Sequence, residues 1–126
     1  MAAAKPDKTV LLIDGDGGFY MHAQELETIR RHGLRILICI LNDGAFGSEI
    51  HKLRSDGVDD SGSVFGRGSL ADIARGFGLG GATVTSANQF AELLQDFERH
   101  SGAALWDIHV SDQVLSPVMR RAVKAH

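Results

Sequence analysis

Cysteine, proline and long apolar runs are scarce in this sequence, and each shortage excludes a class of protein. The single cysteine, Cys39, cannot form an internal disulfide, and we expect it to pack as a small hydrophobic residue, which fits a reducing, cytoplasmic setting. The 2 prolines and 15 glycines follow no period, which excludes a fibrous chain. The longest apolar run, residues 36–41, is far shorter than the ~20 residues that span a bilayer, and residues 1–8 lack the apolar segment of a signal peptide. We expect neither secretion nor a membrane partner.

An excess of basic residues is also missing. The chain has 13 Lys and Arg against 16 Asp and Glu, with no basic run and only 1 Trp and 1 Tyr to stack on bases. Nucleic acid is therefore not an expected partner. With 126 residues, of which 44% are hydrophobic, the chain has the length and composition of one globular domain.

The first third of the chain has the pattern of a βαβ unit. Residues 10–13 and 35–41 are apolar runs without polar alternation, which favours parallel strands buried on both faces. Between them, apolar residues recur at helical spacing at Phe19, Ala23, Leu26 and Ile29. This spacing predicts one amphipathic helix whose last turn includes Arg31 and His32 and which is closed by Gly33.

The second half repeats the alternation of strand and helix. Capping boxes begin two helices, one at Ser69 with Asp72 and one at Ser86 with Gln89. Short apolar segments follow at 82–85 and 104–110, and a last helix is expected from residues 116–117. The predicted fold class is α/β: an open, doubly wound, mainly parallel sheet with helices on both faces.

Residues 47–68 do not follow this alternation. The segment is 22 residues long, rich in Gly, Ser and Asp, and poor in apolar residues. Loops of that length are usually functional or mobile. We expect a long functional loop at about 47–68, with a turn or two of helix around 48–54.

The first motif that could carry chemistry is Gly15-Asp16-Gly17-Gly18, at the point where a strand ends and a helix begins. Ligands bind at such points in open α/β sheets, and glycines allow the backbone to approach an anion such as phosphate. A carboxylate at Asp16 would repel a phosphate unless a cation lies between them. The motif therefore suggests a phosphate held through a hard divalent metal ion.

The second motif, Asn42-Asp43, follows the next predicted strand. If the two strands are neighbours or are separated by one strand, Asp16 and Asp43 can reach one Mg²⁺, although they are 27 positions apart in the sequence. Two ordinary interpretations stay open. A glycine-rich strand-to-helix turn is weak evidence of a ligand by itself, and Asn and Asp are common turn residues.

Taken together, the two motifs resemble the thiamine diphosphate binding motif of the acetolactate synthase, pyruvate decarboxylase and benzoylformate decarboxylase family. The segments that carry the resemblance are Gly15-Asp16-Gly17, Gln24–Thr28, Leu41-Asn42-Asp43, Leu70–Ala74 with Phe77-Gly78, and Leu105–Ile108. They cover nearly the whole chain.

The resemblance implies a role for particular residues. Mg²⁺ would be bound by Asp16, Asp43 and the backbone carbonyl of Ala45, and the amides of Gly17 and Gly18 would bind the diphosphate. The family often has asparagine where this chain has Asp43. The full set of implied cofactor-binding residues is Gly15, Asp16, Gly17, Gly18, Asp43, Ala45 and Phe46.

Three further residues have an open role. Glu49 occupies the place of a glutamate that faces the reacting centre in some family decarboxylases, although a solvated loop glutamate is the simpler interpretation. His51 is either an acid or base near neutral pH or an ordinary surface histidine. His22 is expected to pack against the helix or to face solvent.

The resemblance also implies a function for the chain. Residues 1–126 would be a single domain that binds diphosphate and Mg²⁺, as a fragment of a larger thiamine diphosphate-dependent enzyme that decarboxylates a 2-keto acid or joins the resulting unit to a second carbonyl, as a lyase or a transferase. A flavin in such an enzyme is not readable from this sequence. The alternative is a non-catalytic α/β binding or regulatory domain that retains a Gly-Asp-Gly phosphate turn.

Partners follow from the same resemblance. The cofactor would lie between this domain and the pyrimidine-binding domain of the parent enzyme or of a second subunit, in a homo-oligomer. Because these 126 residues offer no second surface for the aminopyrimidine ring, we expect the isolated chain to be inactive.

Overall fold

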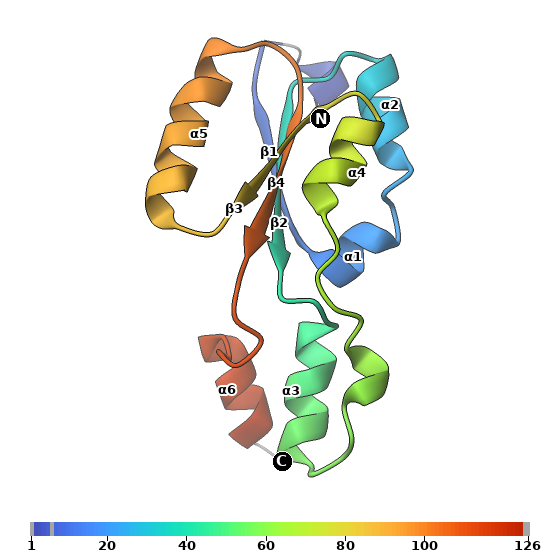
Figure 1. Ribbon diagram of the computed structural model, residues 1–126, viewed down its shortest axis with the longest axis vertical. Coiled ribbons are helices and arrows are strands. Elements are labelled where there is room, and N and C mark those ends of the chain that lie inside the picture. Colours follow the sequence, from blue (N-terminus) through green and yellow to red (C-terminus); the bar gives the residue numbers. More distant parts are fainter. Residues whose placement is uncertain (1, 6, 125–126) are drawn as a thin grey trace.

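A four-stranded parallel sheet forms the centre of the molecule (Figure 1). The computed structural model describes residues 2–5 and 7–124. The strands are β1 (Val10–Gly15), β2 (Ile36–Asn42), β3 (Gly80–Val84) and β4 (Ala104–His109). Their order in the sheet is β1-β2-β4-β3, so all four carboxyl ends meet at one edge.

Helices cover both faces of the sheet, as the sequence predicts. They are α1 (Asp16–Tyr20), α2 (Glu25–Arg31), α3 (Gly47–Ser55), α4 (Leu70–Gly76), α5 (Ala87–Arg99) and α6 (Pro117–Lys124), with short 3₁₀ turns η1 (Ala2–Ala4) and η2 (Ser61–Ser63). Figure 1 shows α1, α2 and α4 on one face and α5 on the other, while α3 and α6 lie beyond the carboxyl ends of the strands. In the described part of the chain, no helix is long and apolar enough to cross a membrane.

Two layers of buried apolar side chains hold the sheet and the helices together. Between the sheet and α1, α2 and α4 lie Phe19, Leu26, Ile38, Ile40, Leu70, Ala74 and Leu105. Between the sheet and α5 lie Leu37, Cys39, Val84, Phe97 and Trp106. Successive residues of β2 alternate between the two layers because side chains of a strand point to opposite faces. The unbroken apolar run of β2 therefore reflects burial on both sides.

The predicted helix starts are confirmed. The Ser69 hydroxyl accepts a hydrogen bond from the Asp72 amide at 3.3 Å, and the Ser86 hydroxyl accepts one from the Gln89 amide at 3.3 Å. Each bond satisfies an amide that the first turn of a helix leaves without an intrahelical partner. Gly33 has a positive φ of 57°, as expected for the residue that follows the end of α2.

Two expectations about the first βαβ unit are wrong. The single helix predicted up to His32 is divided into α1 and α2, because residues 21–24 form tight turns with hydrogen bonds between residues three apart. The strand at 10–13 is not buried on both faces: β1 lies at an edge of the sheet, and Leu11 and Ile13 are 57% and 62% exposed. An apolar run shows that a strand can be covered, but it does not show that a covering element is present.

The segment at 47–68 has more structure than a long loop. The turn or two of helix expected around 48–54 is present as α3, and η2 follows it. Ile50 on α3 is fully buried, which gives this helix an anchor to the rest of the molecule. The remaining part of the segment returns to the turn after β2, where Ala45 and Val64 form an isolated antiparallel bridge.

Candidate functional site

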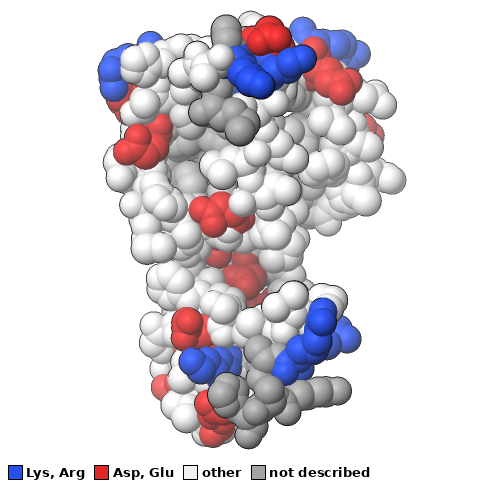
Figure 2. All heavy atoms as spheres, turned by 180° about the vertical axis from the view of Figure 1, so that it is seen from behind, with Lys and Arg blue, Asp and Glu red and all other residues white. Residues whose placement is uncertain are grey.

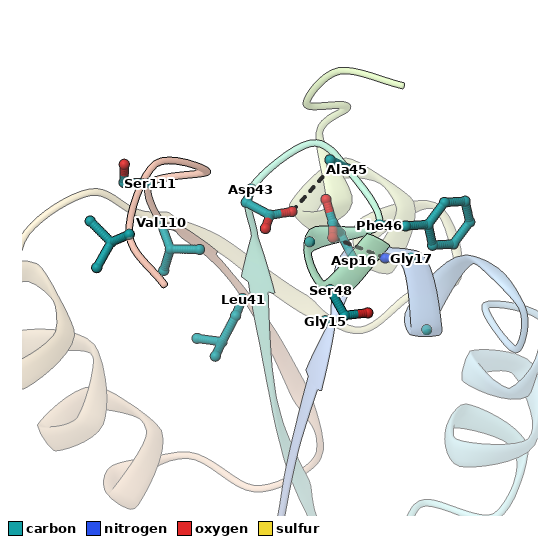
Figure 3. Close-up of a pocket in the computed structure, with 13 residues that line it drawn as sticks. Gly15, Asp16, Gly17, Leu41, Asp43, Ala45, Phe46, Ser48, Val110 and Ser111 are labelled. Atoms are coloured by element: carbon teal, nitrogen blue, oxygen red, sulfur yellow. Dashed lines mark hydrogen bonds between the residues drawn. The ribbon is translucent and has the colours of Figure 1, made fainter. Parts of the chain in front are cut away.

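Asp16 and Asp43 follow the carboxyl ends of two neighbouring strands. β1 and β2 pair in parallel, with Gly15 in register with Leu41. Asp16 is the first residue of α1, and Asp43 comes directly after β2. The fold thus brings together two side chains that are far apart in the sequence, and Figure 3 shows them side by side above the strand ends.

The Asp16 carboxylate is buried and held by two backbone amides. Its Oδ1 accepts a hydrogen bond from the Gly17 amide at 2.9 Å, and its Oδ2 accepts one from the Gly44 amide at 2.8 Å. Burial raises the pKa of this carboxyl above its ordinary value, the two hydrogen bonds lower it, and the nearby charge of Asp43 raises it again. Burial and the Asp43 charge together outweigh the two hydrogen bonds, so the pKa of Asp16 lies above its ordinary value. A cation at this position would stabilise the charged form.

The polar groups of the turn after β2 lie close to Asp16 and Asp43. Gly44 has a φ of 79°, a conformation that favours glycine, and this places its amide on Asp16. The Ala45 amide donates to Asp43 Oδ1 at 3.1 Å. Because the neighbouring residues Gly44 and Phe46 make the hydrogen bonds of the antiparallel bridge, the carbonyl of Ala45 faces away from Val64.

Close packing explains two of the glycines. A Cβ on Gly17 would lie 2.5 Å from the ring of Phe46, and a Cβ on Gly47 would clash with the Asp43 carboxylate. Neither position has room for a side chain unless a neighbour moves. Gly17 and Gly47 therefore keep α1 and α3 close to the two carboxylates.

These groups line one open pocket of about 690 Å³ (Figure 3). It includes every residue that the sequence predicts to bind the cofactor, from Gly15 to Gly18 and from Asp43 to Phe46 with the exception of Gly44. Two carboxylates face it, and among the residues that the structure describes no Lys, Arg or His side chain lines it. Figure 2 shows the same tendency from behind: acidic side chains extend into the middle of this face, whereas Lys and Arg gather towards its ends.

Residues outside the predicted cofactor-binding set complete the pocket wall. They are Leu41, Gly47, Ser48, Val110, Ser111 and Val114. The last three follow β4, which pairs with β2 in the sheet although the two are far apart in the chain. Strand order brings them to the site, and no local motif in the sequence reveals strand order.

The three residues with an open role lie elsewhere. Glu49 is exposed on α3 and does not line the pocket, and His22 is exposed near α2. His51 is not a surface histidine, since it is only 9% exposed in the packing of α3. Within residues 2–5 and 7–124, no three His, Cys, Asp or Glu side chains gather into a metal-binding group. An ion at this pocket would therefore be bound by the two carboxylates together with backbone and ligand oxygens.

A buried carboxylate next to the site, Asp107, is not among the residues that the sequence analysis predicts for the site. Asp107 is 1% exposed, and its carboxylate accepts hydrogen bonds from the Asn42 side chain at 2.8 Å and from the Leu70 amide at 3.0 Å. It thus links β2, β4 and the start of α4. Asn42 is oriented toward Asp107, so Asp43 is the residue of the Asn-Asp pair that is available to the pocket.

Comparison with known proteins identifies the family. The sequence profile of the thiamine pyrophosphate enzyme C-terminal TPP-binding domain matches residues 1–108. The chain belongs to this family. The expected resemblance and the expected fold class are therefore confirmed.

Curated relatives include acetolactate synthases. The large subunit of acetolactate synthase isozyme 1 from Escherichia coli is 33% identical over 114 residues, which cover 86% of this chain and 19% of that protein. Acetolactate synthase from Bacillus subtilis is 32% identical over 111 residues, covering 84% of this chain and 19% of that protein. The chain thus spans about a fifth of the length of these relatives.

A solved structure has the same fold. The thiamine diphosphate-dependent 4-hydroxybenzoylformate decarboxylase of Rhodococcus jostii RHA1 superposes with a TM-score of 0.74 at 24% sequence identity. The match covers 87% of this chain and 21% of that protein. It supports the arrangement of the sheet and helices described above.

Proposed function

We propose that this chain binds the diphosphate of thiamine diphosphate through one Mg²⁺. The observation that carries the proposal is the pocket chemistry: two carboxylates face the site, and no lysine, arginine or histidine from the described part of the chain lines it. Such a site repels a bare diphosphate and suits one that arrives with a hard cation. Asp16, Asp43 and the backbone carbonyl of Ala45 would hold the ion, and the Gly18 amide at the start of α1 would bind a diphosphate oxygen.

The backbone prepares these groups before any ligand arrives. The amides of Gly17 and Gly44 fix the orientation of Asp16, and the Ala45 amide fixes that of Asp43. A carboxylate held in this way loses little conformational freedom when it binds an ion. The role of this chain is then to anchor and orient the cofactor at the sheet edge.

The reaction class that we propose is decarboxylation of a 2-keto acid or acetolactate synthase-like carbon–carbon bond formation. The names of the curated relatives and of the structural neighbour support it. When bound, the cofactor supplies a nucleophilic carbon and an electron sink. We assign no catalytic role to Glu49, because its exposed side chain lies outside the pocket lining.

We also propose that a second domain covers this pocket. The pocket opens to solvent, so a pyrimidine-binding domain, from the parent enzyme or from a second subunit, would cover the ring portion of the cofactor. The substrate would bind between the two surfaces. Enclosure of this kind excludes water from the reacting centre.

Substitution of the two carboxylates tests the ion site. With Mg²⁺ and thiamine diphosphate at about 100 times Kd, the melting temperature of the chain should rise by roughly 10 °C. Asp16→Ala should abolish the rise, because the ion loses its fixed ligand. Asp43→Asn should retain it with about tenfold weaker binding, because an amide oxygen still coordinates.

Three controls keep this test specific. Asp56→Ala removes an exposed carboxylate after α3 and should leave the shift unchanged. ATP or NAD in place of thiamine diphosphate should shift the chain less, and an equal shift would favour a general phosphate-binding or regulatory domain. An unchanged shift in Asp16→Ala with Mg²⁺ present would refute the ion site.

We also propose that these 126 residues alone do not turn over a 2-keto acid. They provide one wall of the site, and one wall neither holds the aminopyrimidine ring nor excludes water. Incubation of the purified chain with thiamine diphosphate, Mg²⁺ and pyruvate or benzoylformate should release no carbon dioxide above the cofactor-only background. Release at about 1 s⁻¹, an ordinary enzyme rate, would contradict the proposal.

A further inference from the structure

Residues 63–67 lie against the turn that follows β2. They lead from the end of η2 towards α4, and Figure 1 shows this part of the chain beside α1, near the carboxyl ends of the strands. The ring of Phe65 packs edge to face against Phe46, with 5.2 Å between ring centroids, and against Tyr20 of α1 at 5.5 Å. The 63–67 segment is therefore anchored to α1 and to the residue that precedes α3.

One hydrogen bond from this segment sets the direction of the Ala45 carbonyl. A trans peptide group is planar, with its N–H and C=O pointing in opposite directions, so a bond to one of them fixes the other. The Phe46 amide donates to the Ser63 carbonyl at 2.9 Å. The Ala45 carbonyl belongs to the same peptide group and therefore points away from residues 63–67. This carbonyl is one of the proposed ligands of the ion.

Two more bonds hold the peptide group between Gly44 and Ala45. The Gly44 carbonyl accepts hydrogen bonds from the amides of Phe65 and Gly66, at 3.0 Å and 2.8 Å. At the other end of this peptide group, the Ala45 amide donates to Asp43 Oδ1 at 3.1 Å. The same segment thus fixes the peptide group that orients the Asp43 carboxylate.

Arg67 adds a side-chain bridge across the ends of two strands. Its Nε donates to the Asn42 carbonyl at 3.1 Å, and its Nη2 donates to the Val110 carbonyl. The Asn42 carbonyl belongs to the peptide group that leads into Asp43, and Val110 lines the pocket. The planar guanidinium group suits two acceptors at fixed positions. Arg67 therefore holds the end of β2 against the segment that follows β4.

Gly44 connects this arginine with the second carboxylate. A Cβ on Gly44 would lie 3.1 Å from the backbone nitrogen of Arg67 and 3.3 Å from its Cγ, so the two residues are in close contact. The Gly44 amide donates to Asp16 Oδ2 at 2.8 Å. Because close-packed groups transmit displacement, movement of Arg67 would alter the surroundings of Asp16 as well as those of Asp43.

We infer that Arg67 is a positioning residue of the ion site. It holds the ends of β2 and β4 so that Asp43 and the Ala45 carbonyl are directed at one ion, and the inference rests on the ion site proposed above. Arg67 is not among the residues that line the pocket, so it acts through the backbone that it binds. Removal of a residue that orients metal ligands typically weakens metal binding by about 10- to 100-fold.

Calorimetric titration of thiamine diphosphate with Mg²⁺ tests this effect. Arg67→Ala should bind about tenfold more weakly than the native chain. Arg75→Ala is the matched control, because Arg75 of α4 also donates to a backbone carbonyl, that of Gly81 at 2.6 Å, and does not line the pocket. It should bind as the native chain does. Equal affinities of the two variants would overturn the inference.

Arg67→Lys separates geometry from charge. Lysine keeps the positive charge but lacks the planar fork that reaches both carbonyls. Its affinity should therefore lie between those of Arg67→Ala and the native chain. An affinity equal to that of the native chain would show that charge alone is required, and would contradict a positioning role.

Hydrogen exchange without cofactor or Mg²⁺ tests the inference separately from the ion site. In Arg67→Ala, the amides of Gly44 and Ala45 should exchange at least about tenfold faster than in the native chain, while the Cys39 amide in the middle of β2 should not change. Failure of the native chain to bind thiamine diphosphate with Mg²⁺ would refute the proposed ion site, and the exchange rates would still decide whether Arg67 positions the turn. Unchanged exchange at both amides would overturn the inference.

Discussion

Asp16 shows how one residue combines backbone geometry with electrostatics. Two amides hold its buried carboxylate, yet burial and the nearby Asp43 leave its pKa above the ordinary value. A buried charge that its own structure does not fully compensate is a common feature of ligand sites. The local motif predicts this residue, because a carboxylate in a turn suited to phosphate points to a cation between the two.

Cys39 gives a prediction at the same scale. Burial raises the pKa of its thiol above the ordinary value of 9.0. Its burial therefore contributes stability that is fully present below pH 9.0 and is lost as the pH rises through the higher pKa of the folded state. We expect the free energy of unfolding of the native chain to fall more steeply with pH in that window than that of Cys39→Ala, by at most about 1.4 kcal/mol per pH unit.

Denaturant titrations at several alkaline pH values measure this difference directly. A thiol reagent gives an independent check, since Cys39 should react only when the chain unfolds. Equal slopes for the native chain and Cys39→Ala, together with rapid labelling of the folded chain, would show that the thiol is not shielded.

The residues that sequence reasoning missed share one property. Gly44 bonds to Asp16 across 28 positions, and Asp107 bonds to Asn42 across 65 positions. Each contact depends on which strands are neighbours. A motif reports local geometry, so it identifies Asp16 and Asp43 but not the residues that orient or support them.

At the scale of elements, helix starts were the most predictable feature. The serine caps of α4 and α5 act through side chains within three positions of the amides that they accept from, so the sequence contains the whole interaction. Burial of β1 was predicted wrongly for the opposite reason. Whether a strand is buried depends on which helices and strands pack against it, and the hydrophobicity of the strand does not identify those elements.

Packing between β3 and α4 gives a prediction about an element contact. A Cβ on Gly81 would clash with the carbonyl of Ala71, and backbone cannot move aside as a flexible side chain can. Gly81→Ala should lower the free energy of unfolding by about 1–3 kcal/mol. Gly76→Ala, at the end of α4, meets nothing within 4 Å and should raise it by about 0.4–1 kcal/mol.

Urea denaturation of both variants measures these two effects against the native chain. The pair is matched because both substitutions add one methyl group near the same helix. If Gly81→Ala were as stable as Gly76→Ala, β3 and α4 would not be packed as closely as described.

At the scale of the whole molecule, the open pocket at the carboxyl ends of the strands is the main feature of the described residues. The family to which the chain belongs is a TPP-binding domain, and the chain spans about a fifth of its curated relatives. We therefore propose that this pocket is one part of a cofactor site.

The main proposal is that binding of the diphosphate requires a metal ion held by Asp16 and Asp43. Isothermal titration calorimetry of the native chain compares thiamine diphosphate with thiamine, each with Mg²⁺ and with a chelator. We expect binding of thiamine diphosphate with Mg²⁺, affinity at least about 100-fold weaker with the chelator, and no measurable binding of thiamine in either condition. Binding of thiamine diphosphate that is unchanged by the chelator, or binding of thiamine with similar affinity, would contradict it.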